Sequence, residues 1–422
     1  MTTMNTPSAE PAAAATRPTT DPPAVTSRAA TANLVLATVG FMVNFWAWAL
    51  LGPLGPGLKE RLGLGFAAQS LLVAVPVVVG SVGRIPVGAL TDRYGARMMF
   101  PLVSLATIVP VLTLAFVQDS YWSMIVAGFF LGIGGTAFAV GVPHVAGWYP
   151  PARRGFAIGV FGIGMGGTAI SNFTTVKLAD TYGSKTPFVL VAAILAGYAV
   201  VSAMLLRDGP YRQRTGGSPL RRTAEVARLA VTWQLSLLYA VGFGGFVAFS
   251  VYLPTYLRTA YELGRNDAAM RTAGFVVLAV IARPIGGWLS DRFHPVPVLV
   301  WSFTGVALLA IVQAFQPELI PIGTMAFLGM ACFLGAASGA VFALVGKLAP
   351  ADKVGAVTGL VGAAGGLGGF LPPLVMGAVY SAEQSYAIGL MLLSDVALAA
   401  AVYTAVKMSG LARRTEPAPV AS

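Results

Sequence analysis

The amino-acid sequence predicts an all-α membrane protein with twelve transmembrane helices in two homologous six-helix bundles. Three observations lead to this prediction. Apolar residues make up 56% of the 422 residues and charged residues only 10%, whereas soluble globular proteins carry about 25% charged residues. The apolar residues gather into twelve stretches, each long enough to span a bilayer as a helix. Motifs of the first half of the chain also return in the second half.

The apolar stretches predict helices rather than strands. A helix of about 20 residues crosses a hydrocarbon core of about 30 Å. A closed barrel is the other structure that satisfies its backbone in lipid, and it needs short strands of alternating polarity, which runs such as LLVAVPVVVG do not supply. We expect spans at 33–57, 68–90, 98–117, 122–147, 156–178, 187–206, 229–258, 270–290, 297–316, 319–347, 355–380 and 384–407.

The positions of the basic residues predict the orientation. Most of the 27 Lys and Arg residues fall in the termini and in the loops after even-numbered spans, and short basic loops stay on the cytoplasmic side. We therefore expect a multi-pass protein of the cytoplasmic (inner) membrane with both termini in the cytoplasm. Residues 1–32, rich in Ala, Thr and Pro, are expected to form a disordered cytoplasmic tail rather than a signal peptide. The remaining predicted units are an N-terminal bundle (33–206), a basic cytoplasmic linker (207–228), a C-terminal bundle (229–407) and a cytoplasmic tail (408–422).

Several classes of function are not expected. The net charge of +11 is scattered over loops and forms no patch suited to nucleic acid. The string GIGMGG at 162–167 interrupts an apolar helix, so it lacks the strand and βαβ unit that a dinucleotide site requires. The single cysteine, Cys332, cannot form an internal disulfide. We expect no nucleotide, no cofactor, no metal site and no enzymatic activity.

The internal repeat relates six spans to six spans. The string RIPVGALTDRY at 84–94 returns as RPIGGWLSDRF at 283–293, with Arg, Gly, Asp, Arg and an aromatic residue in register. A second pair, 149–167 and 349–367, keeps a proline and four glycines in register. Two parallel six-helix halves joined by a longer loop are typical of transporters whose halves rock about a central site.

Arg84 and Arg283 are the residues from which we infer chemistry. A charged residue at mid-membrane costs about 2.5–3.5 kcal/mol, and each arginine precedes a loop aspartate by eight residues, or about 12 Å of helix. A structural carboxylate could neutralise each one, but Asp395 is the one acid that lies clearly within a span, and it cannot serve both. Two unpaired guanidinium groups suit a planar oxyanion that accepts several hydrogen bonds. The sequence therefore predicts a site for a small anion.

Two glycine clusters lie on the fifth and eleventh spans. Glycine in a helix interior costs about 1 kcal/mol, and small residues let helices approach closely. These clusters therefore indicate close contacts between helices. The sequence does not decide whether the helices slide past each other during transport or are packed statically. They comprise Gly159, Gly162, Gly164, Gly166, Gly167, Gly362, Gly365, Gly366, Gly368 and Gly369.

The loops after the second and eighth spans carry charges that could hold the halves in one state. Asp92 and Arg93 follow the second span, and Asp291 and Arg292 follow the eighth. We interpret these four residues as a cytoplasmic latch of ion pairs. His144, near the end of the fourth span, could carry a proton, although a lone histidine more often has a packing role.

At this point the sequence resembles a known family. The duplicated layout and the DRYGAR loop are similar to the major facilitator superfamily, and finer strings are similar to its bacterial nitrate/nitrite porters, over about 33–407. These strings are WALLGPLGP (48–56), the two arginine strings, GWYPPARRGFAIG (147–159) and GLVGAAGGLGGFLPP (359–373). Met165 stands where the family usually has asparagine, and Ser338 where it has an Asn-Gly step.

The resemblance implies the major facilitator fold and a set of site residues. In that family's pattern Arg84 and Arg283 hold the anion, Phe138, Tyr239 and Phe243 wall it, and the two glycine clusters are the nitrate signatures. Phe45, Trp46 and Trp48 also lie on a span expected near the pathway, but the sequence does not decide whether they face it.

The resulting hypothesis is a secondary active transporter of nitrate or nitrite that works by alternating access in the lipid bilayer. One alternative is transport of another small anion such as formate or oxalate, and a second is an anion-sensing receptor with a transporter-like fold. Proton symport and anion exchange both remain open.

Overall fold

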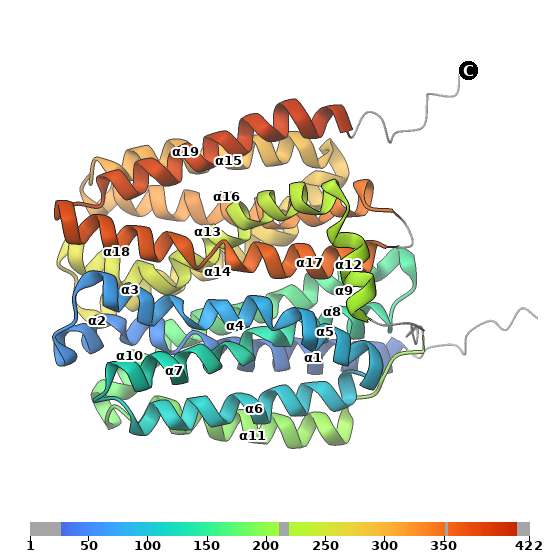
Figure 1. The fold of residues 1–422 in the computed structure, drawn as a ribbon, viewed down its shortest axis with the longest axis horizontal. Helices are drawn as coiled ribbons and strands as arrows, with labels where there is room; N and C mark the ends of the chain where they lie inside the picture. Colours follow the sequence, from blue (N-terminus) through green and yellow to red (C-terminus); the bar gives the residue numbers. More distant parts are fainter. Residues whose placement is uncertain (1–26, 211–218, 351–352, 412–422) are drawn as a thin grey trace, which may run out of the picture.

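The computed structural model describes residues 27–210, 219–350 and 353–411. Within these residues every regular element is a helix, and the long helices lie side by side along one common direction (Figure 1). The prediction of an all-α fold is therefore confirmed. Residues 1–26 and 412–422 of the predicted tails, and 211–218 of the predicted linker, lie outside the described residues.

In the first half of the chain, several apolar stretches consist of two or three consecutive helices. Its elements are α1 (Ser27–Trp48), α2 (Leu51–Leu62), α3 (Phe66–Ala74), α4 (Pro76–Val82), α5 (Arg84–Tyr94), α6 (Ala96–Phe116), α7 (Tyr121–Leu131), η1 (Gly132–Thr136), α8 (Ala137–Ala146), α9 (Pro151–Gly162), η2 (Ile163–Gly166), α10 (Gly167–Tyr182) and α11 (Thr186–Leu205). The helix α1 begins inside the predicted tail because Ala29, Ala30 and Ala32 are strong helix formers.

The second half repeats this order with longer unbroken helices. Its elements are α12 (Pro219–Ala227), α13 (Ala230–Tyr261), α14 (Arg265–Phe293), α15 (Pro295–Ala314), η3 (Leu319–Gly323), α16 (Thr324–Leu348), α17 (Val354–Leu367), α18 (Leu371–Glu383), α19 (Ala387–Tyr403) and η4 (Thr404–Met408). The short helix α12 lies within the predicted linker.

Eleven segments of the described chain are long and apolar enough to cross a membrane. The fifth expected span, 156–178, coincides with α9, η2 and α10 but is not among these eleven. The count of twelve therefore stays a prediction. Large apolar side chains such as Trp122, Trp301 and Val109 are exposed on the outer helices, as expected where helices face lipid.

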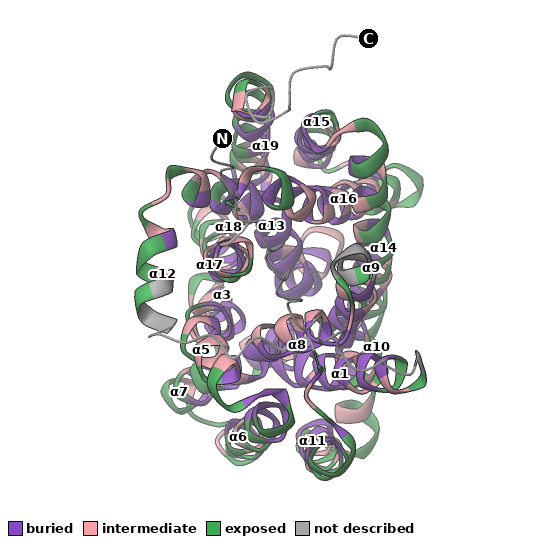
Figure 2. Ribbon diagram, turned by 90° about the vertical axis from the view of Figure 1, so that its right-hand side faces the viewer, coloured by how far each residue is buried: buried purple, intermediate pink, exposed green. Residues whose placement is uncertain are grey.

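The described chain begins and ends at the same end of the bundle, which we call the terminal end (Figure 1, right). The view onto this end shows α13 and α17 on one side and α1 and α8 on the other, with exposed surface on the outer faces of α6, α11 and α19 (Figure 2). The two halves therefore meet along the middle of the molecule. We call the opposite end the distal end.

Polar contacts join the two halves at the distal end. Arg258 of α13 forms an ion pair with Glu60 of α2, and Arg265 of α14 lies 3.2 Å from Asp180 of α10. Deeper in the interface, the Gln69 amide of α3 donates to the Thr255 hydroxyl of α13 across 2.8 Å.

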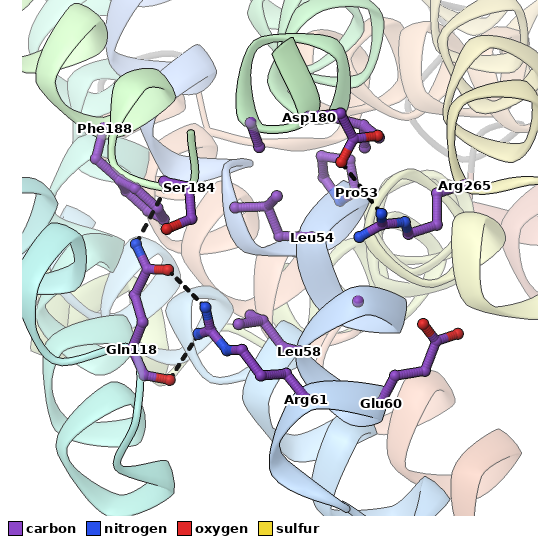
Figure 3. A pocket seen from close by; sticks show the side chains of 13 residues that line it. Pro53, Leu54, Leu58, Glu60, Arg61, Gln118, Asp180, Ser184, Phe188 and Arg265 are labelled. Carbon is purple, nitrogen blue, oxygen red and sulfur yellow. Dashed lines mark hydrogen bonds and ion pairs between the residues drawn. The ribbon is translucent and has the colours of Figure 1, made fainter. Parts of the chain in front are cut away.

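A cavity of about 410 Å³ opens beside the second ion pair. Figure 3 shows Asp180 and Arg265 paired with each other on one side of the cavity. The Arg61 guanidinium bonds the side chain of Gln118 at 3.0 Å and the backbone oxygen of Gln118 at 2.7 Å. Its two arginines and its two acids, Glu60 and Asp180, balance in charge. The lining of this cavity therefore carries no net charge.

Glycines bring α14 and α16 into direct backbone contact. A Cβ atom at Gly286 would collide with the carbonyl oxygen of Ala336, and one at Gly335 would collide with that of Ala279. A Cβ at Gly339 would collide with the carbonyl oxygen of Arg283 itself. Because backbone cannot move aside cheaply, these glycines fix the depth and rotation of the helix that carries Arg283.

This packing predicts that Gly335→Ala and Gly339→Ala each destabilise the protein. The added methyl group overpacks a backbone contact, which typically costs about 1–3 kcal/mol. The measurement is thermal unfolding of the purified protein in detergent. Gly274→Ala, also on α14 but with open space around its Cβ position, is the control and should leave the midpoint unchanged or raise it. Equal midpoints for all three variants would contradict the packing role.

Candidate functional site

Arg84 lies at the centre of the interface between the halves. It is the first residue of α5, follows Gly83 and is only 7% exposed. Its Nη1 donates to the carbonyl oxygen of Gly362 on α17, in the other half, across 2.7 Å. Its Nε is buried and has no hydrogen-bond partner among the described residues. Glycines place this residue, because a Cβ at Gly132 of η1 would collide with the Pro76 carbonyl oxygen on α4, next to α5.

Arg283 approaches the same region from α14. Its Nη2 donates to the Tyr239 hydroxyl at 3.0 Å, and its Nη1 lies 2.7 Å from the Met165 sulfur on η2. Met165 thus belongs to the opposite half and contacts the arginine directly. The second departure from the family pattern, Ser338, lies on α16 and donates to the Leu334 carbonyl of its own helix.

One aromatic ring contacts both arginines. The Cζ atoms of Arg84 and Arg283 each lie 5.6 Å from the centroid of Phe243. Phe138 adds a second ring to Arg84 at 5.1 Å, and Tyr239 stacks on Phe243 with 4.8 Å between ring centroids. The structure therefore brings together all five residues predicted to bind the anion.

Phe342 of α16 also belongs to the aromatic residues around the two arginines, and it was not predicted from the sequence. Its ring centroid lies 5.5 Å from Cζ of Arg283 and 4.7 Å from the Tyr239 ring. Phenylalanine is common in apolar spans, so nothing in the sequence distinguished this one. Phe342 follows Gly339 by three residues. The structure places Gly339 against the backbone of Arg283, and Phe342 therefore lies near this arginine.

No acid of the described residues neutralises the charges of the two arginines. Neither arginine forms an ion pair with another described residue. Asp395, the acid considered for this role, is exposed on α19. Each arginine instead bonds neutral acceptors, and each reaches one acceptor in the opposite half. The site is therefore cationic and spans the interface.

A small cavity of about 10 Å³ adjoins Arg84, which is room for about one water-sized atom. Phe45 and Trp48 line it together with Phe243. Two of the aromatic residues left open by the sequence therefore face the site. The third, Trp46, packs against a separate apolar cluster of the first half.

The glycine clusters divide into two groups. A Cβ would collide with Tyr239 at Gly365, with Ser81 at Gly366 and with Phe41 at Gly164. Similar collisions would occur at Gly167, Gly368 and Gly369, whereas Gly362 has only an ordinary contact with Phe138. At Gly159, Gly162 and Gly166 nothing lies within 4 Å of the Cβ position. Close packing thus accounts for the first group, and the sliding role stays a prediction.

The predicted latch residues lie at helix ends, away from the arginine cluster. Arg93 stacks on Tyr94 at 5.1 Å, and Arg292 on Phe293 at 5.6 Å. Asp92 is half-buried and Asp291 is exposed. The latch therefore stays a prediction.

His144 is buried in α8. Its ring lies 6.3 Å from that of Phe100, edge to face, and it is not among the residues that line the cavity beside Arg84. Its contact with Phe100 fits the packing interpretation, whereas the proton-carrier interpretation stays a prediction.

Sequence comparisons place these features in a family. The profile of the Major Facilitator Superfamily matches residues 37–373. The chain is 51% identical over 381 residues to the probable nitrate/nitrite transporter NarK2 of Mycobacterium tuberculosis, covering 90% of this chain and 96% of the relative. It is 37% identical to the nitrite extrusion protein of Bacillus subtilis, covering 88% and 92%, and 33% identical to the probable nitrate transporter NarT of Staphylococcus aureus strain Newman, covering 82% and 87%.

Solved structures share the fold at low sequence identity. A bacterial homologue of the lysosomal transporter Spinster superposes with a TM-score of 0.69 at 18% identity, covering 92% of this chain and 99% of that one. A D-xylose–proton symporter superposes with a TM-score of 0.70 at 15% identity, covering 88% and 96%. The predicted major facilitator fold and the prediction of a transporter rather than an enzyme are both confirmed. With Arg84 and Arg283 at equivalent places in its two halves, the chain belongs to the Major Facilitator Superfamily and, within it, to the nitrate/nitrite porter family.

Proposed function

We propose that this protein is a secondary active transporter that moves nitrate or nitrite across the cytoplasmic membrane by alternating access. The observation that carries the proposal is the pair of arginines, which come from opposite halves, contact one phenylalanine ring and have no carboxylate partner among the described residues. The names of the relatives support nitrate and nitrite as the substrates.

In the proposed mechanism the anion replaces neutral acceptors of the two guanidinium groups. Arg84 exchanges its bond to the Gly362 carbonyl, and Arg283 its contacts with Tyr239 and Met165, for bonds to anion oxygens. Hydrogen bonds between charged partners are roughly twice as strong as those between neutral ones, and the planar fork matches a planar oxyanion. Phe138 and Phe243 exclude water, which strengthens these interactions.

The location of the acceptors couples binding to the relative position of the halves. Since each arginine reaches across the interface, an anion that bonds both arginines links the two halves. The distal polar contacts must separate when the site opens toward the distal end. The anion site and the distal contacts are thus two places where the halves are joined.

Two other functions remain as alternatives. Formate and oxalate are also planar oxyanions, and competition for uptake against labelled nitrate distinguishes them. A receptor that senses the anion would bind it without moving it, and the uptake assay itself distinguishes this function.

The first functional prediction concerns the guanidinium forks. Arg84→Lys and Arg283→Lys should each reduce nitrate uptake into proteoliposomes at least a hundredfold, because a point charge cannot reproduce two parallel hydrogen bonds. Arg271→Lys, on the same helix as Arg283 but half-exposed and paired with Asp267, is the control and should transport normally. Near-normal uptake by a correctly inserted variant of Arg84 or Arg283 would remove that arginine from the site.

The second prediction concerns the distal ion pairs. The double substitution Glu60→Gln and Asp180→Asn removes both pairs and should shift the protein toward a state open at the distal end. Labelling of a cysteine introduced at Thr255, in the interface beneath these pairs, should then accelerate several-fold. Glu383→Gln, a distal carboxylate that forms no ion pair with another described residue, is the control. Unchanged labelling would show that the pairs do not hold this end closed.

The third prediction concerns coupling. Two arginine charges repel each other, and an anion between them lowers this repulsion, so movement without a bound anion should be slow. Liposomes loaded with nitrite should take up nitrate several-fold faster than liposomes without an internal anion under a pH gradient. This result would indicate exchange of nitrate for nitrite. Exchange is contradicted if the pH gradient alone drives rapid nitrate uptake and the double variant His144→Ala, Asp395→Asn retains that uptake.

A further inference from the structure

The cavity beside Arg84 contains two hydrogen-bond donors that bond nothing in the described part of the protein. One is the Nε of Arg84, which is buried without a partner. The other is the hydroxyl of Ser81, a residue of α4 that is 2% exposed. This hydroxyl forms no hydrogen bond to a described residue, although the Ser81 carbonyl accepts one from the Gly83 N–H. Since they lie three residues apart, Ser81 and Arg84 project from the same side of the second span. The third polar side chain in the lining, Trp48, donates its Nε1 to the Pro76 carbonyl at 3.2 Å and is thereby engaged.

A glycine of the opposite half closes this cavity. A Cβ at Gly366 would collide with the Ser81 hydroxyl and would lie 3.5 Å from Nη1 of Arg84. The absence of a side chain at position 366 thus keeps open a space of about 10 Å³ next to both donors. That space suits one oxygen atom, and two free buried donors favour an oxygen that carries negative charge.

We propose that this cavity is a pocket for one oxygen of nitrate and that Ser81 discriminates nitrate from nitrite. The inference rests on the proposed function, in which the two arginines hold the anion. Nitrate is trigonal and planar, so two of its oxygens can face the two guanidinium groups while the third points into the pocket. There it accepts hydrogen bonds from the Ser81 hydroxyl and from Nε of Arg84. Nitrite has only two oxygens, and both are used by the arginines.

The test compares nitrate and nitrite binding to the purified protein in detergent by calorimetry. Ser81→Ala removes one donor and little volume, so it should weaken nitrate binding about tenfold, as expected for a hydrogen bond to a charged group. It should change nitrite binding less than about twofold. Ser81→Cys, with a weak donor of similar size, should fall between the wild type and Ser81→Ala for nitrate.

The control is Ser236→Ala on α13, which removes a buried hydroxyl that has no hydrogen-bond partner among the described residues and lies away from this cavity. It should leave both affinities unchanged. Gly366→Ala fills the pocket from the other half and should also weaken nitrate more than nitrite, whereas Gly166→Ala, its counterpart in the repeat with open space around it, should not.

Two results would overturn the proposal, namely no loss of nitrate affinity in Ser81→Ala or an equal loss for both anions. Failure of the proposed function is distinguishable, because Arg84→Lys would then bind nitrate as tightly as the wild type. If Arg84→Lys loses nitrate binding while Ser81→Ala retains it, only the oxygen pocket is wrong.

Discussion

The structure depends on two positive charges at the interface of the halves, one buried and one half-buried, that no carboxylate of the described residues neutralises. Each guanidinium group at mid-membrane costs about 2.5–3.5 kcal/mol, and the described chain offsets this cost only with neutral hydrogen bonds and aromatic rings. Cation–π contacts contribute about 0.5–2 kcal/mol each. They lower the cost but leave the charge in place, so an anion remains the strongest available partner.

The packing of the helices serves to hold these charges in position. Arg84 begins helix α5 beside the close contact of α4 with η1. The backbone carbonyl of Arg283, on α14, lies directly against Gly339 of α16. In both halves it is a missing Cβ that lets backbone approach backbone. The many glycines thus determine where the arginines lie, although they carry no chemistry themselves.

Much of the site could be predicted because the repeat made it visible. An arginine at the same place in both halves of an apolar chain requires a chemical reason, and the resemblance to the porter family added Phe138, Tyr239 and Phe243. Phe342 and Ser81 were missed, since a phenylalanine or a serine in an apolar span has many possible environments. The role of the Gly362 carbonyl was also invisible, because a backbone acceptor leaves no trace in the sequence.

The distal ion pairs were missed for a different reason. Glu60 and Arg258 are almost two hundred residues apart, and only the docking of the two halves brings them together. The duplicated loops at the opposite end predict a separate ion-pair latch, because their charges repeat within the sequence, and that latch stays a prediction. Contacts between the halves depend on their relative position, which local sequence patterns do not encode.

The most direct measurement is an experimental structure of the protein with nitrate, determined at a resolution that defines the anion. One nitrate should lie between the halves, with oxygens within hydrogen-bond distance of both guanidinium groups and with Arg84 released from the Gly362 carbonyl. A nitrate that contacts only one of the two arginines, or that lies in the distal cavity beside Arg265, would contradict the shared site.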